Sequence, residues 1–295
     1  MANLKEIRTR ISSVGSMRQI TSAMKMVAAA KLKKVQETVT NFRPYALKMQ
    51  EIMANVASSV ADGEDNVFAV DRDYGQVLIV VITSNKGLCG AFNSNVIKEA
   101  VQLAERKYSG YLAPSKIRYL AIGKKGYDAL RKRKVQLEDA VTDIIDNPGY
   151  DDVAVIAQSL MDKFLKGQYD CIDIVYNEFV NAATQNVICK QFLPIVNEEK
   201  TAGKQQEQQS DYIFEPTKKY IIKEMIPITL RQSFYGALLD SVASEYGSRM
   251  TSMHQATDNA SSLIQDLTLQ YNKARQAAIT NEILEIVGGA EALKG

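Results

Sequence analysis

Residues 231–292 read RQSFYGALLDSVASEYGSRMTSMHQATDNASSLIQDLTLQYNKARQAAITNEILEIVGGAEA. The stretch contains no proline, and from Met250 onward small or apolar residues recur at alternating steps of three and four. This spacing is a heptad repeat, which predicts a coiled-coil helix of about 55 residues, roughly 80 Å long. Such a helix needs a partner to bury its seam. The seam positions are Met250, Met253, Thr257, Ala260, Ile264, Leu267, Tyr271, Ala274 and Ala278.

We expect this partner at the other end of the chain. Residues 3–42 also lack proline, and apolar residues follow one side of a predicted helix. The step from Val14 through Met17 to Ile20 is three and three, where a strict heptad requires a four, so the helix is expected to be bent or irregular. The two ends should pair as one antiparallel hairpin. The expected seam is Leu4, Ile7, Ile11, Val14, Met17, Ile20, Met24, Val27, Leu32, Val35, Val39 and Phe42.

The middle of the chain alternates between strand and helix patterns. Residues 76–83, QVLIVVIT, form a β-branched run that predicts a buried, parallel, central strand. Further strands are expected at residues 116–122, 169–179, 185–195 and 211–216, and the strands 169–179 and 185–195 are expected to pair as an antiparallel hairpin. Helices are expected at residues 94–106, from the GKKG turn through Arg133, and at residues 151–165, where Asp151 would be the N-cap. Residues 197–210 are expected to form a loop.

These patterns predict a long antiparallel coiled coil joined to a Rossmann-like α/β domain of about five strands. We divide the 295 residues into an N-terminal coiled-coil helix (1–60), a central α/β domain (61–217) and a C-terminal coiled-coil helix (218–295). Pro44 is expected to interrupt or kink the first helix near Asn41, because proline disfavours the helical state of the residue before it.

The charge of the chain is concentrated in its first helix. The net charge is only +2, yet residues 1–60 hold ten Lys or Arg against three Glu. Acidic protein, nucleic acid or anionic membrane could each bind such a helix. Nucleic-acid binding is disfavoured because Phe42 is the only aromatic residue up to Arg43. A solvated helix face and an acidic protein partner remain.

Sites for chemistry are sparse. Three cysteines, Cys89, Cys171 and Cys189, form no C-x-x-C pair, which is typical of small buried side chains in a reducing compartment. The single histidine, His254, lies on the heptad helix, and no cluster of metal ligands or nucleophile and base is recognisable. We therefore expect no catalytic residue, metal or cofactor. No apolar run is long enough to span a membrane, and the first residues do not resemble a secretory signal.

Two glycine-bearing turns follow predicted strands, at residues 84–90 (SNKGLCG) and 123–126 (GKKG). Helix N-termini bind anions, so a phosphate site near Lys86 is one interpretation. Neither turn matches a known phosphate-binding motif, and glycine in a tight turn is the commoner explanation. A phosphate-binding α/β enzyme and a free-standing coiled-coil adaptor therefore stay as alternatives.

Four segments resemble one family. Residues 279–292, ITNEILEIVGGAEA, are similar to the signature of the γ subunit of rotary (F-type) ATP synthases. Residues 5–34 (KEIRTRISSVGSMRQITSAMKMVAAAKLKK), 82–93 (ITSNKGLCGAFN) and 271–283 (YNKARQAAITNEI) resemble the same family, in the same order along the chain. The signature positions are Ile279, Thr280, Glu282, Glu285, Gly289 and Ala290.

The resemblance implies a rotor shaft without an active site. It implies contacts with three α and three β subunits, the ε subunit and the membrane c-ring, but no nucleic acid and no membrane span. The absence of a cysteine-bearing insert in residues 197–210 implies no thiol regulation, and the start MANLKEI implies a bacterial protein at the cytoplasmic face of the plasma (inner) membrane.

The resemblance also assigns residues to contacts. Four positions match the surface that meets the β-subunit catch loops: Arg275, Gln276, Thr280 and Glu282. Met24 and Lys25 match the region passing the acidic β lever. An apolar bearing tip would comprise Ile279, Ile283, Ile286 and Val287. Tyr212 and Glu215 match the foot segment near ε and the c-ring.

Overall fold

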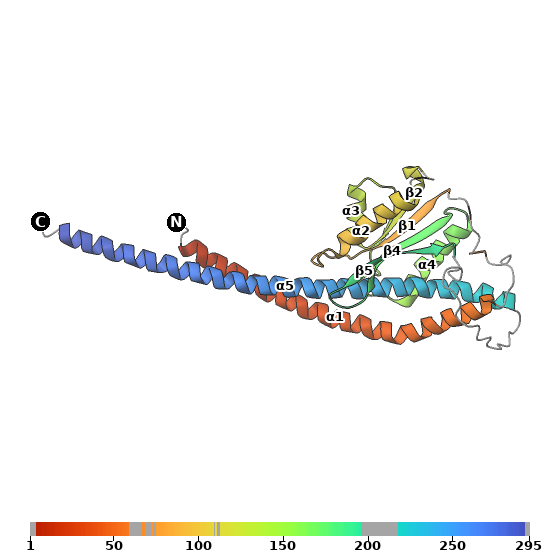
Figure 1. The fold of residues 1–295 in the computed structure, drawn as a ribbon, viewed down its shortest axis with the longest axis horizontal. Helices are drawn as coiled ribbons and strands as arrows, with labels where there is room; N and C mark the ends of the chain where they lie inside the picture. The colour runs from red at the N-terminus through yellow and green to blue at the C-terminus, as the bar shows by residue number, and fades with distance from the viewer. Residues whose placement is uncertain are drawn as a thin grey trace. The chain divides into compact units, whose positions relative to one another are not determined.

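Two long helices frame the fold in the computed structural model, which describes residues 4–58, 67–68, 72, 75–108, 110, 113–195 and 218–292. Helix α1 (Leu4–Ser58) has 55 residues and α5 (Lys218–Ala292) has 75 (Figure 1). The expected interruption near Pro44 is wrong, since α1 continues through this proline, while the alternative of a kink there stays a prediction. A proline inside a helix costs about 3 kcal/mol. Tertiary contacts can offset this cost, and Phe42 packs edge-on against Tyr235, with ring centroids 5.1 Å apart.

The chain divides into two compact units, and both long helices contribute to each. One unit combines the described parts of residues 1–29 and 249–295, and the other comprises those between residues 30 and 248. The division into residues 1–60, 61–217 and 218–295 stays a prediction.

The first unit is a pair of helix segments that run in opposite directions, as predicted (Figure 1). The α5 seam is confirmed from Met250 to Ala274: Met253, Ala260 and Leu267 are buried, and the positions between them are half-buried. Ala278 is the exception, because it is exposed. The seam of α5 therefore ends before the last turns of the helix.

The seam of α1 agrees with the prediction at nine of its twelve positions, which are buried or half-buried, and differs from it between Val14 and Ala28. Met17, Ile20 and Val27 are 57–60% exposed, whereas Thr21 and Ala28 are buried. The row of Ile7, Val14, Thr21, Ala28 and Val35 advances in unbroken steps of seven, so the predicted irregularity after Val14 is wrong. The prediction assigned the largest apolar side chains to the seam. Small side chains occupy it instead, and a hydrogen bond of 2.8 Å joins the Oγ1 atoms of Thr21 and Thr257.

The second unit contains a five-stranded sheet of order β3-β2-β1-β4-β5. Its central strand β1 (Val77–Ile82) pairs in parallel with β2 (Ile117–Ile122) and β4 (Cys171–Phe179), and β4 pairs antiparallel with β5 (Gln185–Leu193). All six side chains of β1 are buried. The buried central parallel strand and the antiparallel hairpin are therefore confirmed.

Helices cover both faces of this sheet (Figure 1). Helix α2 (Phe92–Leu103), prolonged by a π-helix (Ala104–Tyr108), and α3 (Lys124–Lys132) pack on one face. Helix α4 (Tyr150–Leu165) and the first part of α5 lie on the other, where Phe234 meets Phe192 of β5 with centroids 5.7 Å apart. A short 3-10 helix (Pro114–Lys116) precedes β2.

Two local predictions need correction. The fifth strand is β3 (Leu137–Val141), which pairs with β2 and was not predicted, because it is a short acidic edge strand without a fully buried side chain. The predicted strand at residues 211–216 lies outside the described residues. Asp151 is not the N-cap of α4: the cap is Gly149, and Asp151 lies in the first turn, where its charge favours the helix dipole.

Candidate interaction surfaces

The edge of the sheet where α/β proteins bind ligands is closed by α5. In such sheets the site lies at the carboxyl ends of the strands where the strand order reverses, which here is beside β1 and β4. Ser248 Oγ donates to the Cys89 carbonyl at 2.7 Å, and Ser244 Oγ donates to the Asn177 carbonyl at 3.1 Å. A Cβ added at Gly247 would lie 3.2 Å from the Ala182 backbone. Residues 244–248 of α5 therefore cover the carboxyl edge of the sheet beside β1 and β4.

The GKKG turn is a packing feature. The first backbone N–H groups of α3, which could bind a phosphate, already donate to the segment after β1. Gly123 has a φ of 104°, and a Cβ there would lie 2.3 Å from the Thr83 carbonyl oxygen. The close approach of the two backbones thus requires glycine at position 123. The N–H groups that would bind an anion at this turn already have acceptors, which argues against an anion site there. The three bonds are Lys124 N to Asn85 Oδ1 (3.1 Å), Lys125 N to the Ser84 carbonyl (3.0 Å) and Gly126 N to Thr83 Oγ1 (2.9 Å).

The cysteines and the histidine occupy positions without reactive surroundings. Cys89 and Cys171 are buried and Cys189 is half-buried. Burial, together with Glu99, raises the pKa of the Cys189 thiol to about 12, so it stays protonated and a weak nucleophile at neutral pH. His254 is exposed, with Nδ1 at 3.3 Å from Asp258. Within the described part of the chain, no group of three His, Cys, Asp or Glu could hold a metal ion.

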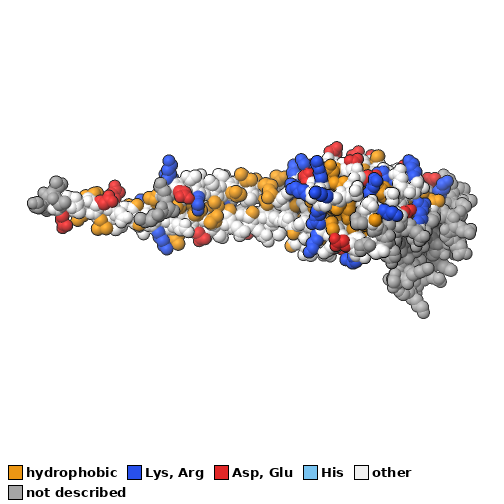
Figure 2. Space-filling model, turned by 90° about the horizontal axis from the view of Figure 1, so that it is seen from above, with side chains coloured by type: hydrophobic (Ala, Val, Ile, Leu, Met, Phe, Trp, Pro, Cys, Tyr) orange, Lys and Arg blue, Asp and Glu red, His pale blue; other side chains and the backbone are white. Residues whose placement is uncertain are grey.

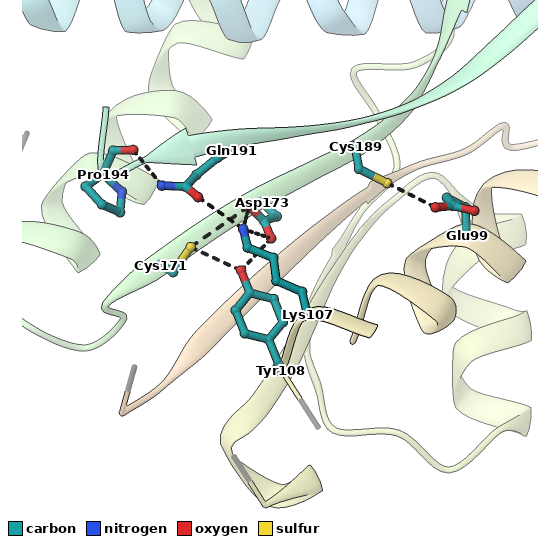
Figure 3. A network of polar contacts seen from close by, with 8 residues as sticks. All are labelled: Glu99, Lys107, Tyr108, Cys171, Asp173, Cys189, Gln191 and Pro194. Carbon is teal, nitrogen blue, oxygen red and sulfur yellow. Dashed lines mark hydrogen bonds and ion pairs between the residues drawn. The ribbon is translucent and has the colours of Figure 1, made fainter. Parts of the chain in front are cut away.

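A buried charged network joins the π-helix to the sheet (Figure 3). Asp173 of β4 is buried, and Tyr108 Oη donates to its Oδ2 at 2.5 Å. Lys107 Nζ donates to both Asp173 oxygens, at 3.1 and 3.0 Å, and to Gln191 Oε1 at 3.0 Å. Burial and the negative charge of Asp173 raise the pKa of Tyr108, which keeps the phenol a donor. This network was not predicted, and its signal in the sequence is the acidic Asp173 inside an otherwise apolar strand.

The end of α5 is exposed. Arg275, Gln276, Thr280 and Glu282 all face solvent, and Thr280 Oγ1 donates back to the Gln276 carbonyl at 2.9 Å. The predicted tip residues are exposed as well, and Leu284, which was not predicted, adds to them. A run of exposed large apolar side chains marks a contact surface. The exposed apolar residues are Ile279, Ile283, Leu284, Ile286 and Val287.

A second exposed apolar row lies on α1. Met24 and Lys25 are half-buried, while Met17, Ile20 and Val27, which the prediction had placed in the seam, face solvent. The structure therefore brings Met24 next to an apolar surface. Tyr212 and Glu215 lie outside the described residues. No described helix holds a stretch apolar and long enough to cross a bilayer.

The fold and these surfaces define a protein that acts through contacts made by two long helices attached to an α/β unit. The profile of a family described as ATP synthase matches residues 3–293. The ATP synthase gamma chain of Flavobacterium psychrophilum is 52% identical over 100% of both chains, and that of Cytophaga hutchinsonii is 48% identical over 99% of both. The chain belongs to the ATP synthase gamma chain family, so the resemblance read from the sequence is confirmed.

Solved structures agree with this assignment. The central stalk and c-ring structure of Tetrahymena thermophila mitochondrial ATP synthase contains a chain with a TM-score of 0.58 and 30% identity, covering 80% of this chain and 99% of that one. A rotor chain of the Euglena gracilis mitochondrial ATP synthase reaches a TM-score of 0.62 at 22% identity, over 94% of this chain and 98% of that one, and supports the fold alone.

Proposed function

We propose that this chain is the central rotor shaft of an F-type ATP synthase, which couples proton-driven rotation of a c-ring to ATP synthesis or hydrolysis. Its partners are three α and three β subunits, the ε subunit and the c-ring. The observation that carries this proposal is the exposed end of α5, where apolar side chains continue beyond the last seam position that is covered. A free-standing adaptor has no support among the relatives.

The chain acts without an active site of its own. The closed sheet edge and the occupied N–H groups of α3 support this part of the proposal. A shaft favours different states of the surrounding catalytic subunits only by contacting them differently. Moving a two-state equilibrium across most of its range requires about 5 kcal/mol of differential contact energy.

Particular residues supply these contacts. The exposed polar residues Arg275, Gln276, Thr280 and Glu282 meet the β-subunit catch loops. Met24 and Lys25 meet the acidic β lever, for which the basic first helix is electrostatically suited. The exposed apolar residues Ile279, Ile283, Ile286 and Val287 turn in an apolar sleeve, where few directional bonds are broken at each step.

The foot of the rotor contacts ε and the c-ring through the segment that contains Tyr212 and Glu215. In this proposal the C-terminal coiled-coil helix (218–295) starts at residue 218, where α5 begins. The chain is a peripheral subunit of a membrane-bound complex, and we place it at the cytoplasmic face of a bacterial plasma membrane.

The catch-loop contact can be tested by changing Arg275 and Gln276 to Ala together. Both side chains are exposed, so the isolated chain should unfold at an unchanged temperature. In a ring reconstituted with α and β subunits, ATP hydrolysis should fall about fivefold or more, since buried Arg contacts dominate interfaces. Hydrolysis by the purified ring with and without the variant chain measures the effect.

The matched control changes Lys223 and Glu224 to Ala. Both side chains of this pair are exposed as well, and the pair lies on the same helix, but near its start. The control should assemble and hydrolyse ATP like the unchanged chain. Failure of the unchanged chain to assemble with α and β subunits would overturn the proposed function. Equal activity of both variants would overturn only the catch-loop assignment.

A further inference from the structure

The segment from β2 to the end of α3 is strongly basic. Residues 116–134 contain eight Lys or Arg and one acidic residue, Asp128, although the whole chain has a net charge of only +2. Figure 2 shows Lys and Arg side chains gathered on one face of the α/β unit. The eight cations are Lys116, Arg118, Lys124, Lys125, Arg131, Lys132, Arg133 and Lys134.

Five of these residues form what we call the basic corner: Lys116, Arg131, Lys132, Arg133 and Lys134. All five are exposed, and none of them forms an ion pair with another described residue. The helix dipole favours cations in the last turn of α3, but this effect fades beyond that turn. Lys134 follows the helix with a φ of 55°, a left-handed conformation in which glycine is usual. A lysine at this position is conformationally less favourable than glycine, but it adds a positive charge.

The basic corner lies at the amino edge of the sheet. Ile117, Val77 and Cys171 form one row across the first residues of β2, β1 and β4. Lys116 directly precedes this row. The backbone N–H of Tyr119, the third residue of β2, donates to the Gln136 carbonyl at 2.9 Å, which holds the segment that follows α3 beside the first half of β2.

The last strand ends at the same edge. Leu193, the final residue of β5, pairs with Ile172 at the start of β4. Strand β5 therefore ends at the amino edge, and the proposed function assigns Tyr212 and Glu215, which follow it in sequence, to the c-ring contact. The basic corner and the end of β5 share one edge of the α/β unit.

We propose that the basic corner binds the anionic phospholipid headgroups of the membrane around the c-ring. The proposal rests on the proposed function, because a c-ring contact at this edge turns the corner toward the bilayer. A stationary acidic protein would have to be released at every turn of a rotor. A fluid layer of headgroups presents the same potential at every angle, so it attracts the corner without holding it at one angle.

The chemistry of the corner suits a diffuse anionic surface. Lys and Arg are mixed and exposed, so they neutralise charge without selecting one bidentate partner. A cation close to an anionic membrane surface strengthens binding about fivefold, and the attraction decays over about 8–10 Å at physiological salt.

The test measures flotation of the full chain with vesicles that lack protein. We expect binding to vesicles of phosphatidylcholine and phosphatidylglycerol, little binding to phosphatidylcholine alone, and release by salt. Changing Arg131, Lys132, Arg133 and Lys134 to Gln should weaken binding to anionic vesicles about tenfold or more, because each charge contributes about fivefold when it is close to the surface. Exchanging Arg for Lys and Lys for Arg at the same four positions should preserve binding.

The matched control removes four exposed charges from α1, by changing Lys5, Arg8, Arg10 and Arg18 to Gln. It alters the net charge by the same amount, and binding should fall less than for the corner variant. Equal losses in both variants, or no preference of the unchanged chain for anionic vesicles, would overturn the proposal. The proposal would also be overturned if the corner variant bound vesicles like the unchanged chain but lost binding to purified c-rings in neutral detergent. The partner of the corner would then be a protein. Assembly with α and β subunits is measured separately, so this failure would leave the proposed function intact.

Discussion

Asp240 illustrates how burial sets the properties of single residues here. Burial on α5 and the nearby Glu178 raise the pKa of its carboxyl group to about 6, against the opposing effect of Arg43. The folded chain therefore holds this proton more tightly than the unfolded chain between about pH 4 and pH 6. The stability contributed by Asp240 is present at low pH and is lost as the pH rises through this window.

Asp240→Asn should remove the loss of stability that ionisation of Asp240 causes as the pH rises. Above pH 6 we expect the free energy of unfolding to rise by up to about 2 kcal/mol, and below pH 4 the variant and the unchanged chain should have equal stability. Urea unfolding at a series of pH values measures the difference. Asp266→Asn, at an exposed position on the same helix, is the control. A difference for Asp240→Asn that stays constant from pH 4 to pH 7 would contradict the assignment.

Asp173 shows why part of the interior could not be read from sequence. Its charge in a buried strand is compensated by Tyr108 and Lys107, which lie 65 and 66 residues earlier in the chain. Removing one partner would leave a buried charge uncompensated, which is far more costly than losing an exposed pair. No local pattern joins these residues, because the π-helix and β4 meet only when the sheet has formed.

At the scale of elements, the seam of α1 makes the clearest prediction. Ala28 is 2% exposed, so Ala28→Leu should overpack the helix pair and lower the free energy of unfolding by about 1–3 kcal/mol. Changing the exposed residues Met17 and Ile20 to Ser should alter it by less than about 0.5 kcal/mol each. Thermal and urea unfolding decide between the two seams. A larger loss at Met17 and Ile20 than at Ala28 would restore the irregular seam.

The elements differ in how far sequence predicts them. Six consecutive apolar residues and flanking turns were enough to identify β1 as a buried central strand, because burial on both faces removes alternation. Strand β3 lacks that signal, because a strand at the edge of the sheet can accommodate charged residues such as Glu138 and Asp139. In α1, a rule that favours large side chains misplaced the seam between Val14 and Ala28. The helix continues through Pro44, and Phe42 beside it packs against Tyr235, which is far away in sequence.

The candidate surfaces were predictable to different degrees. The residues at the end of α5 were chosen by family resemblance, and the structure finds them exposed. Their contacts with other subunits stay predictions, because exposure is needed for such contacts and does not establish them. The basic corner was readable as a charge run from Arg131 to Lys134, but its place at the amino edge follows only from the strand register.

At the scale of the whole molecule, the α/β unit must be held firmly to the shaft if torque is to pass between them. The first part of α5 is attached to the carboxyl edge of the sheet through Ser244, Gly247 and Ser248. At Gly247 the helix backbone itself comes close to the sheet edge, since a Cβ there would lie 3.2 Å from the Ala182 backbone and 3.4 Å from the Phe179 ring. A backbone neighbour gives way less easily than a flexible side chain.

Gly247→Val should therefore push α5 away from the sheet edge. The expected loss in free energy of unfolding is about 1–3 kcal/mol, as for other overpacked positions. In reconstituted membranes, proton-driven ATP synthesis should fall more than ATP hydrolysis, because hydrolysis by the ring needs the end of the shaft whereas synthesis needs the connection to the α/β unit. The ratio of the two rates at equal amounts of assembled complex measures this.

Gly15→Val is the matched control, since the same substitution inside a long helix, α1, places its Cβ at a position where nothing lies within 4 Å. Any effect of valine on helix propensity is then shared by both variants, and the difference between them reports the contact with Ala182 and Phe179. If Gly247→Val lowers synthesis and hydrolysis in the same proportion, the sheet edge contributes to folding and not to transmission. Torque would then pass through the paired helices alone, without a contribution from this attachment of the α/β unit.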